Sequence, residues 1–200
     1  MTATPSVRLP AAERRRELVD AALRVFSEGS YAGATTAQIA REAGVSEPIL
    51  YRHFASKREL YFACLDTAWE RIRLRIQDRI DELGPALGWQ AIGPGTMREM
   101  KVLLPSLWMQ AITEAGEDPE IRRHVRGHMR EVHDFFANVL RRVQEEGGIQ
   151  PERDPDTEAW IFVAGSLLVS VADRLGGPLT AKDFDAIKTE RLRWLTGASS

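Results

Sequence analysis

Hydrophobic residues recur along this chain with the spacing of an α-helix almost everywhere. A helix is expected over residues 10–28, and Gly29 ends it. Its apolar stripe is formed by Leu18, Ala21, Ala22, Val25 and Phe26. No stretch shows the sustained alternation of polar and apolar residues that is typical of a β-strand. The pattern predicts an all-α fold of about nine helices.

Polar capping residues indicate where several helices begin. Thr35 and Gln38 form a T-x-x-Q capping box, and Ser56 with Glu59 forms a second one before a long helix that reaches Leu83. Later starts are indicated by Thr96 with Glu99, Asp118-Pro119, Asp154-Pro155 and Thr180 with Asp183. They predict helices over residues 96–115, 119–146, 155–175 and 181–195.

Proline and glycine predict the breaks in this pattern. An irregular connection is expected at Gly84, Pro85, Gly88, Gly93, Pro94 and Gly95. Pro105 should kink or split the helix expected over residues 96–115. We expect an N-terminal domain over residues 10–58 and a C-terminal helical domain over residues 59–200.

Charge is divided unevenly between these two parts, although the net charge is only −2. Residues 1–58 carry nine basic and six acidic side chains, whereas the remaining residues carry 18 and 23. This asymmetry indicates an N-terminal part that faces an anion. The single cysteine, Cys64, excludes an internal disulfide and fits a reducing compartment.

We expect neither a secretory leader nor a membrane segment. Its N-terminus lacks the apolar stretch of a signal peptide. The most apolar run, Trp160 to Ala172, has 13 residues, fewer than the roughly 20 that a membrane helix needs. We expect a cytoplasmic protein.

The spacing within residues 35–54 predicts a helix-turn-helix. Two helices that cross steeply through a short turn need a small residue at the contact, here Ala40, and a residue tolerant of positive φ, here Gly44. Ser46 would cap the second helix, and Val45 could pack on Leu50. With Leu50 and Phe54 turned inward, the outer face is left for contact with the DNA major groove.

The run TTAQIAREAGVSEPILYRHFASKREL resembles the DNA-binding domain of the tetracycline-repressor (TetR) family of transcriptional regulators. Its most specific part is the pattern L-Y-x-H-F-x-S-K, which here is LYRHFASK over residues 50–57. The resemblance covers about residues 10–70; beyond them only the length, the helical pattern and the layout match. In that family the C-terminal domain dimerises and often binds a small ligand.

The resemblance implies a set of DNA-contacting residues. Phosphate contacts would come from Thr35 or Thr36, Tyr51 and Lys57, and Lys57 also lies in a first helical turn, where free N–H groups favour phosphate. Base edges would be read by Glu47, Pro48 and Arg52, next to the capping Ser46 and to His53. Simpler roles stay open for three of them: Tyr51 packing on the first helix, His53 supporting its own helix, and Glu47 acting as a first-turn acid.

The C-terminal domain is rich in large, soft side chains that suit either a ligand pocket or a helical core. They are Phe62, Trp69, Trp89, Met97, Met100, Trp108, Met109, Met129, Phe135, Phe136, Trp160 and Phe162. The residues that we predict to bind a ligand, because they lie on the central helices, are Trp69, Trp108, Met109, Ile112, Met129 and Phe136. Polar candidates beside them are Gln110, Thr113, His128 and His133.

Three histidines on one predicted helix raise the question of a metal site. His124 and His128 have the i,i+4 spacing that can bind zinc. Interleaved arginines at 122, 123, 126 and 130 disfavour a dication, and no further ligand follows at a recognisable spacing. We therefore predict neither a metal nor a cofactor.

Residues 157–175 are apolar almost all round, which indicates a helix that is central in its domain or shared with a partner. The family resemblance makes this helix and the last one the interface of a homodimer. The residues that we predict at this interface are Trp160, Ala164, Leu168, Val171, Ile187 and Trp194. A two-fold dimer would bind a pseudo-palindromic operator.

These observations predict a homodimeric, DNA-binding transcriptional regulator, a repressor released by a small apolar or amphipathic effector. Two alternatives stay open: an activator, and a regulator whose C-terminal domain binds a protein partner. An enzyme is not expected, because the chain contains no H-E-x-x-H, no G-x-S-x-G and no phosphate-binding glycine loop.

Overall fold

The computed structural model describes residues 10–92 and 104–197, and these ranges hold nine α-helices. The chain separates into two compact units, Met1–Thr67 and Ala68–Ser200, which we call the head and the body. An all-α fold is therefore confirmed. Among the described helices, none combines the length and the apolar character that crossing a membrane requires.

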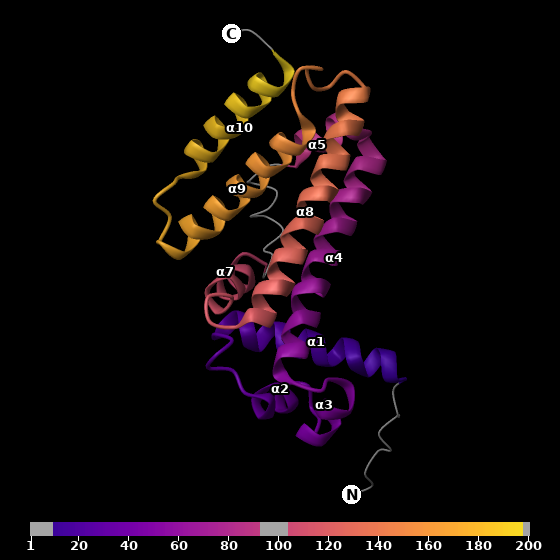
Figure 1. Ribbon diagram of the computed structural model, residues 1–200, viewed down its shortest axis with the longest axis vertical. Helices are drawn as coiled ribbons and strands as arrows, with labels where there is room; N and C mark the ends of the chain where they lie inside the picture. The colour runs from indigo at the N-terminus through magenta and orange to yellow at the C-terminus, as the bar shows by residue number, and fades with distance from the viewer. Residues whose placement is uncertain (1–9, 93–103, 198–200) are drawn as a thin grey trace, which may run out of the picture. The chain divides into compact units, whose positions relative to one another are not determined.

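Three helices and the first turns of a fourth build the head (Figure 1). They are α1 (Ala11–Glu28), α2 (Thr36–Glu42), α3 (Glu47–His53) and α4 (Lys57–Leu83), which continues into the body. Four of the five residues in the predicted stripe on α1 are buried, with Leu18 and Phe26 fully covered, and Val25 is half-buried. Phe26 meets the ring of Tyr61 edge-on at 5.0 Å between ring centroids, so α1 and α4 share one aromatic core within the head.

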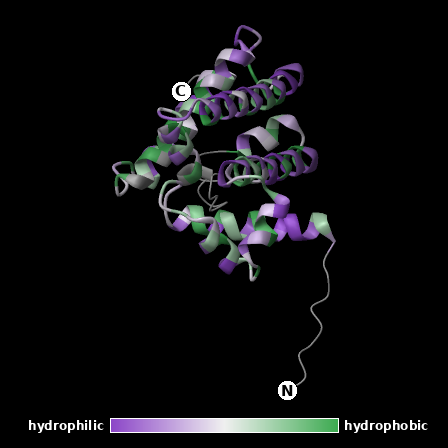
Figure 2. Cartoon of the chain, turned by 60° about the horizontal axis from the view of Figure 1, so that its bottom comes forward, coloured by the Kyte–Doolittle hydropathy of each residue, from purple (hydrophilic) through white to green (hydrophobic). Residues whose placement is uncertain are grey.

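In the body, α5, α7 and α9 pack against α8, and α10 lies beside α9 (Figure 1). These helices are α5 (Pro85–Ala91), α7 (Leu104–Glu114), α8 (Pro119–Glu145), α9 (Pro155–Arg174) and α10 (Ala181–Thr196). The main hydrophobic core joins Trp69, Ile72, Ile76 and Ile80 of α4 with Phe136 and Leu140 of α8. Hydrophilic and hydrophobic residues alternate along the helices in Figure 2, as expected when one face of each helix is buried.

Several helix starts confirm the capping residues predicted from the sequence. Thr35 and Gln38 form a complete capping box, as do Thr180 and Asp183. The Asp118 carboxylate accepts from two backbone N–H groups at the start of α8.

Two predicted caps differ in detail. Ser46 occupies the N-cap position of α3, but its hydroxyl makes no capping bond. Because Pro48 lies in the first turn, that turn offers one fewer N–H to be satisfied. At α4 the Ser56 hydroxyl accepts from the Glu59 N–H as predicted, while the Glu59 carboxylate accepts from the N–H of Ala55.

One predicted connection is a helix instead. Residues 85–91, which we expected to be irregular, form α5. Pro85 starts it at a position that needs no N–H partner, and Gly88 lets it approach α4, because a Cβ at Gly88 would lie 2.8 Å from the Cα of Ile80. The other predicted breaks at residues 93–95 and the start predicted at Thr96 lie outside the described residues. Pro105 lies in the first turn of α7, which begins at Leu104; the preceding part of the helix expected over residues 96–115 lies outside the described residues.

Replacing Gly88 with alanine should destabilise the body, because the added methyl group forces α5 away from α4. We expect Gly88→Ala to lower the free energy of unfolding by about 1–3 kcal/mol. Gly127→Ala is the matched control, since Gly127 is an exposed residue of α8 whose added Cβ would meet nothing within 4 Å. Thermal unfolding of both variants checks this, and a Gly88→Ala protein as stable as Gly127→Ala would contradict the close contact.

Candidate functional site

The helix-turn-helix forms with the contacts that its spacing predicted. Ala40 is 2% exposed at the helix crossing, and Gly44 has a φ of 67° in the turn. The N–H of Val45 donates to the Ala40 carbonyl at 2.9 Å and closes that turn. Leu50 and Phe54 are 0% and 1% exposed, so they fix the inner side of α3.

The outer side of α3 consequently presents an arginine, a tyrosine and a proline to solvent. Pro48 and Arg52 are exposed, and the Tyr51 side chain is 49% exposed. His53 is half-buried at the end of the helix, and Ser46 is exposed before it. A short helix with a buried apolar side and an arginine on its open side has the chemistry needed to enter a major groove.

A small hydrogen-bonded cluster joins α2 to α3 on this surface. The Thr36 hydroxyl donates to the Glu47 carboxylate and lies 3.1 Å from the Tyr51 hydroxyl. Thr36 and Glu47 are both half-buried, whereas Thr35 is exposed and forms the N-cap of α2. The structure therefore brings together three of the residues predicted to contact DNA, and it holds the Glu47 carboxylate in a fixed direction.

The Lys57 side chain is half-buried and hydrogen-bonded within the head, whereas a freely exposed phosphate ligand was expected. Its ammonium donates to the carbonyls of Tyr31 and Ala34, at 2.8 and 3.1 Å, and lies 4.5 Å from the centroid of the Tyr31 ring. Sequence reasoning missed this role, since the turn between α1 and α2 meets the start of α4 only in the folded head. Lys57 therefore ties that turn to α4.

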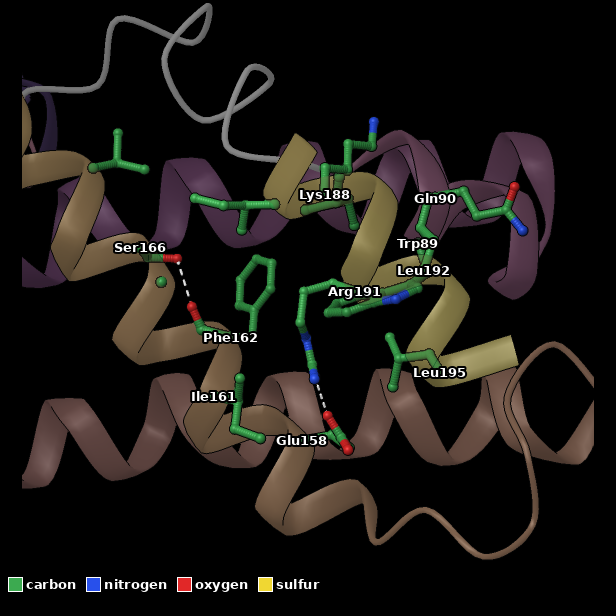
Figure 3. Close-up of a pocket in the computed structure, with 14 residues that line it drawn as sticks. Trp89, Gln90, Glu158, Ile161, Phe162, Ser166, Lys188, Arg191, Leu192 and Leu195 are labelled. Carbon is green, nitrogen blue, oxygen red and sulfur yellow. Dashed lines mark hydrogen bonds and ion pairs between the residues drawn. The ribbon is translucent and has the colours of Figure 1, made fainter. Parts of the chain in front are cut away.

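The body holds a cavity of about 160 Å³ between α5, α9 and α10 (Figure 3). Its apolar wall includes Trp89, Phe162, Val169 and Leu192, and it is also lined by Glu158, Lys188 and Arg191. None of the six residues predicted to bind a ligand lines it. No signal in the sequence connects α9 with α10 around a common space, so this set could not be found from spacing alone.

The six predicted ligand residues lie elsewhere in the body. Trp69, Trp108 and Phe136 are buried, Met109 and Met129 are half-buried, and Ile112 is 37% exposed. The rings of Trp69 and Trp108 lie 6.2 and 4.9 Å from the ring of His128. Within the described part of the chain, the two buried indole N–H groups meet no acceptor. Phe136 packs on Phe162 at 4.3 Å and so stands one layer behind the cavity wall.

Large apolar side chains are exposed along α9 and α10. Trp160 is 44% exposed, Leu168 is 45%, Ile187 is 41% and Trp194 is 52%; Ala164 is exposed and Val171 half-buried. Two of these side chains are held in place from within. Trp160 stacks on the buried His133 at 4.2 Å, and the Trp194 indole N–H donates to Glu158 at 3.2 Å.

Two family models match the chain. Residues 18–64 match bacterial regulatory proteins of the tetR family, and residues 94–165 match the C-terminal domain of BetI-type transcriptional repressors. The transcriptional activator FasR of Mycolicibacterium smegmatis is 53% identical over 58 residues, which is 29% of this chain and 26% of FasR. In this match the chain therefore spans about a quarter of the length of FasR.

Two further proteins match this chain over most of its length, including both the head and the body. The transcriptional repressor KstR2 of Mycobacterium tuberculosis is 27% identical over 173 residues, which is 84% of this chain and 86% of KstR2. A crystal structure of a TetR-family transcriptional regulator from Agrobacterium tumefaciens shares the fold, with a TM-score of 0.75 at 21% identity. That match covers 94% of this chain and 100% of the other.

Removing the Lys57 ammonium should destabilise the head even without DNA. We expect Lys57→Met to lower the free energy of unfolding by about 1–3 kcal/mol, because two backbone carbonyls lose a charged donor. Arg41→Met, which removes one positive charge from an exposed position of α2, should change it by less than about 0.5 kcal/mol. Urea unfolding checks both; equal effects would mean that Lys57 contributes only charge.

Proposed function

The chain belongs to the TetR family of bacterial regulatory proteins, and from this membership we propose that it is a homodimeric repressor which a small apolar or amphipathic effector releases from its operator. DNA-binding regulation of transcription, and not enzymatic catalysis, is the common activity of the family. Such a protein acts on chromosomal DNA, so we place it in the cytoplasm. The observation that carries the proposal is the open face of α3, with Pro48, Tyr51 and Arg52 exposed above the buried Leu50.

DNA contacts are proposed for both sides of the helix-turn-helix. Arg52 would donate to a guanine in the major groove, while Pro48 would contact an apolar edge such as a thymine methyl. Thr35, Thr36 and Tyr51 would donate to backbone phosphates.

Four further residues would act at the edge of the contact. The Glu47 carboxylate, oriented by Thr36, would accept from cytosine N4. Ser46 and His53 would contribute at the two ends of α3. Lys57 would contact phosphate through the ammonium N–H that does not donate to the carbonyls of the turn between α1 and α2.

Dimerisation is proposed through the exposed apolar faces of α9 and α10. An apolar surface of this kind on two neighbouring helices is typical of a protein interface. The contact would be made by Trp160, Ala164, Leu168, Val171, Ile187 and Trp194 of each copy. Two copies related by a two-fold axis would place their α3 helices in successive major grooves, about 34–36 Å apart.

The effector is proposed to bind inside the body near Trp69, Trp108, Met109, Ile112, Met129 and Phe136. Two buried indole N–H groups without an acceptor in the described residues support this, since a ligand oxygen would satisfy them. Binding would favour a conformation in which α4, which begins at Lys57 in the head, shifts direction. The state that fits the operator would then be depopulated.

Repression is proposed over activation because of the extent of two sequence matches. The match to the repressor KstR2 extends over most of both chains, whereas the match to the activator FasR covers only 58 residues. This difference favours a repressor. A body that binds a protein partner instead of an effector is the alternative, and it is supported by the same exposed residues of α9 and α10.

Removing the Arg52 guanidinium should weaken binding to the operator. On a duplex enriched by the wild-type protein from a random pool, Arg52→Ala should cost about 1–3 kcal/mol and relax the preference at one position of each half-site. Arg79→Ala is the control, because Arg79 is an exposed arginine of α4 in the body. Fluorescence anisotropy titrations check this, and equal affinities of the two variants would exclude Arg52 as a base-reading residue.

A charge in the exposed apolar face should separate the dimer. Leu168→Asp would place a carboxylate where the partner copy is proposed to pack, so we expect monomers at micromolar concentration. Leu87→Asp changes an equally apolar residue of α5 that is 60% exposed, and it should leave the dimer intact. Sedimentation velocity distinguishes the two; a dimeric Leu168→Asp protein would place the interface elsewhere.

A further inference from the structure

The surface that lines the cavity between α5, α9 and α10 is mostly apolar, although charged and polar residues also contribute to it. In Figure 3 the Phe162 ring lies in the middle of this space, between the stem of Arg191 and the backbone of α9. Trp89, Ile92 and Leu195 also line the cavity. A space with these walls excludes ions from its interior and favours the apolar part of a ligand.

Three charged residues line the same cavity, and two of them neutralise each other. Glu158 is only 5% exposed, and its carboxylate accepts from the Arg191 guanidinium and from the Trp194 indole N–H. Among the described residues, Lys188 forms no ion pair; its stem lines the cavity and its ammonium end points away from Phe162 (Figure 3). One positive charge therefore remains uncompensated at the edge of an apolar space.

The volume limits the size of a ligand. A cavity of about 160 Å³ is close to the engineered apolar cavity of about 150 Å³ that accommodates benzene. An apolar portion of roughly six to eight carbon atoms would fill it. Gly165 supports the presence of free space, because it lines the cavity and a Cβ added there would meet nothing within 4 Å.

We propose that this cavity binds a small amphipathic monoanion, such as a medium-chain carboxylate, with its apolar chain against Phe162 and its anionic group beside the Lys188 ammonium. The charge balance of the lining residues favours one negative charge, and the apolar wall excludes a second one inside. The site is distinct from the six residues proposed to bind the effector, because none of them lines it; Phe136, one of the six, packs on Phe162 from behind the cavity wall.

Occupation of this site would strengthen the attachment of α10. This helix reaches α9 through the bonds of Arg191 and Trp194 to Glu158, and through a small cluster in which Phe184 packs with Val169 and Ala172. A chain that fills the space between the two helices adds apolar contact to both. Because the bound form is stabilised, the thermal midpoint of unfolding should rise with ligand concentration.

Isothermal titration calorimetry of the full-length protein with sodium octanoate, and separately with the uncharged 1-octanol, tests the proposal. We expect wild-type protein to bind one octanoate per chain, and Lys188→Gln to weaken octanoate roughly tenfold while octanol is unaffected. Gly165→Leu should abolish binding of both, since its side chain would occupy the cavity. No DNA is present, so the outcome does not depend on operator binding.

The matched control is Gly127→Leu, an exposed position of α8 with equally open surroundings, which should bind octanoate like the wild type. Thermal unfolding of every variant establishes that it is folded. Absence of octanoate binding by the wild type, or undiminished binding by Gly165→Leu, would overturn the site. An unchanged octanoate affinity in Lys188→Gln would overturn the recognition of the anion; Lys188 is half-buried at the cavity edge and belongs to no buried core cluster among the described residues.

Discussion

Burial of Leu50 and Phe54 is the constraint on which the proposed DNA-binding surface depends. Because α3 is only seven residues long, two inward side chains are enough to fix its rotation. Once they are covered, Tyr51 and Arg52 must lie on the open side. The bond between Thr36 and Glu47 then ties this side of α3 to α2, so in the proposed complex the side chains would meet DNA from a rigid support.

The body obeys a different constraint, since α9 has more apolar surface than its own unit can cover. Ala159 and Val163 are buried, whereas Trp160 and Leu168 remain nearly half exposed. Each square ångström of apolar surface left in water costs about 25 cal/mol, and the proposed packing of a second copy on α9 would remove that cost. The buried Glu158 carboxylate is tolerated because Arg191 and Trp194 both donate to it, and these bonds orient α10 beside the cavity.

Local sequence signals predicted much of the fold because they act over a few residues. The capping boxes at Thr35 and Thr180 and the positive φ of Gly44 are of this kind. Helix α5 was missed because Gly88 resembles a helix breaker until its close approach to Ile80 is known. The position of Lys57 and the lining of the cavity escaped prediction for the same reason, since both depend on which helices meet in space.

Methylation protection of guanine N7 along a duplex bound by the wild-type protein would test the central claim most directly, because N7 lies in the major groove. A dimer that reads DNA through α3 predicts two protected windows centred about 10 base pairs apart, with guanines between them on the far face of the duplex left reactive. Protection in a single window, or binding that leaves every guanine N7 reactive, would contradict major-groove reading by a two-fold pair of α3 helices.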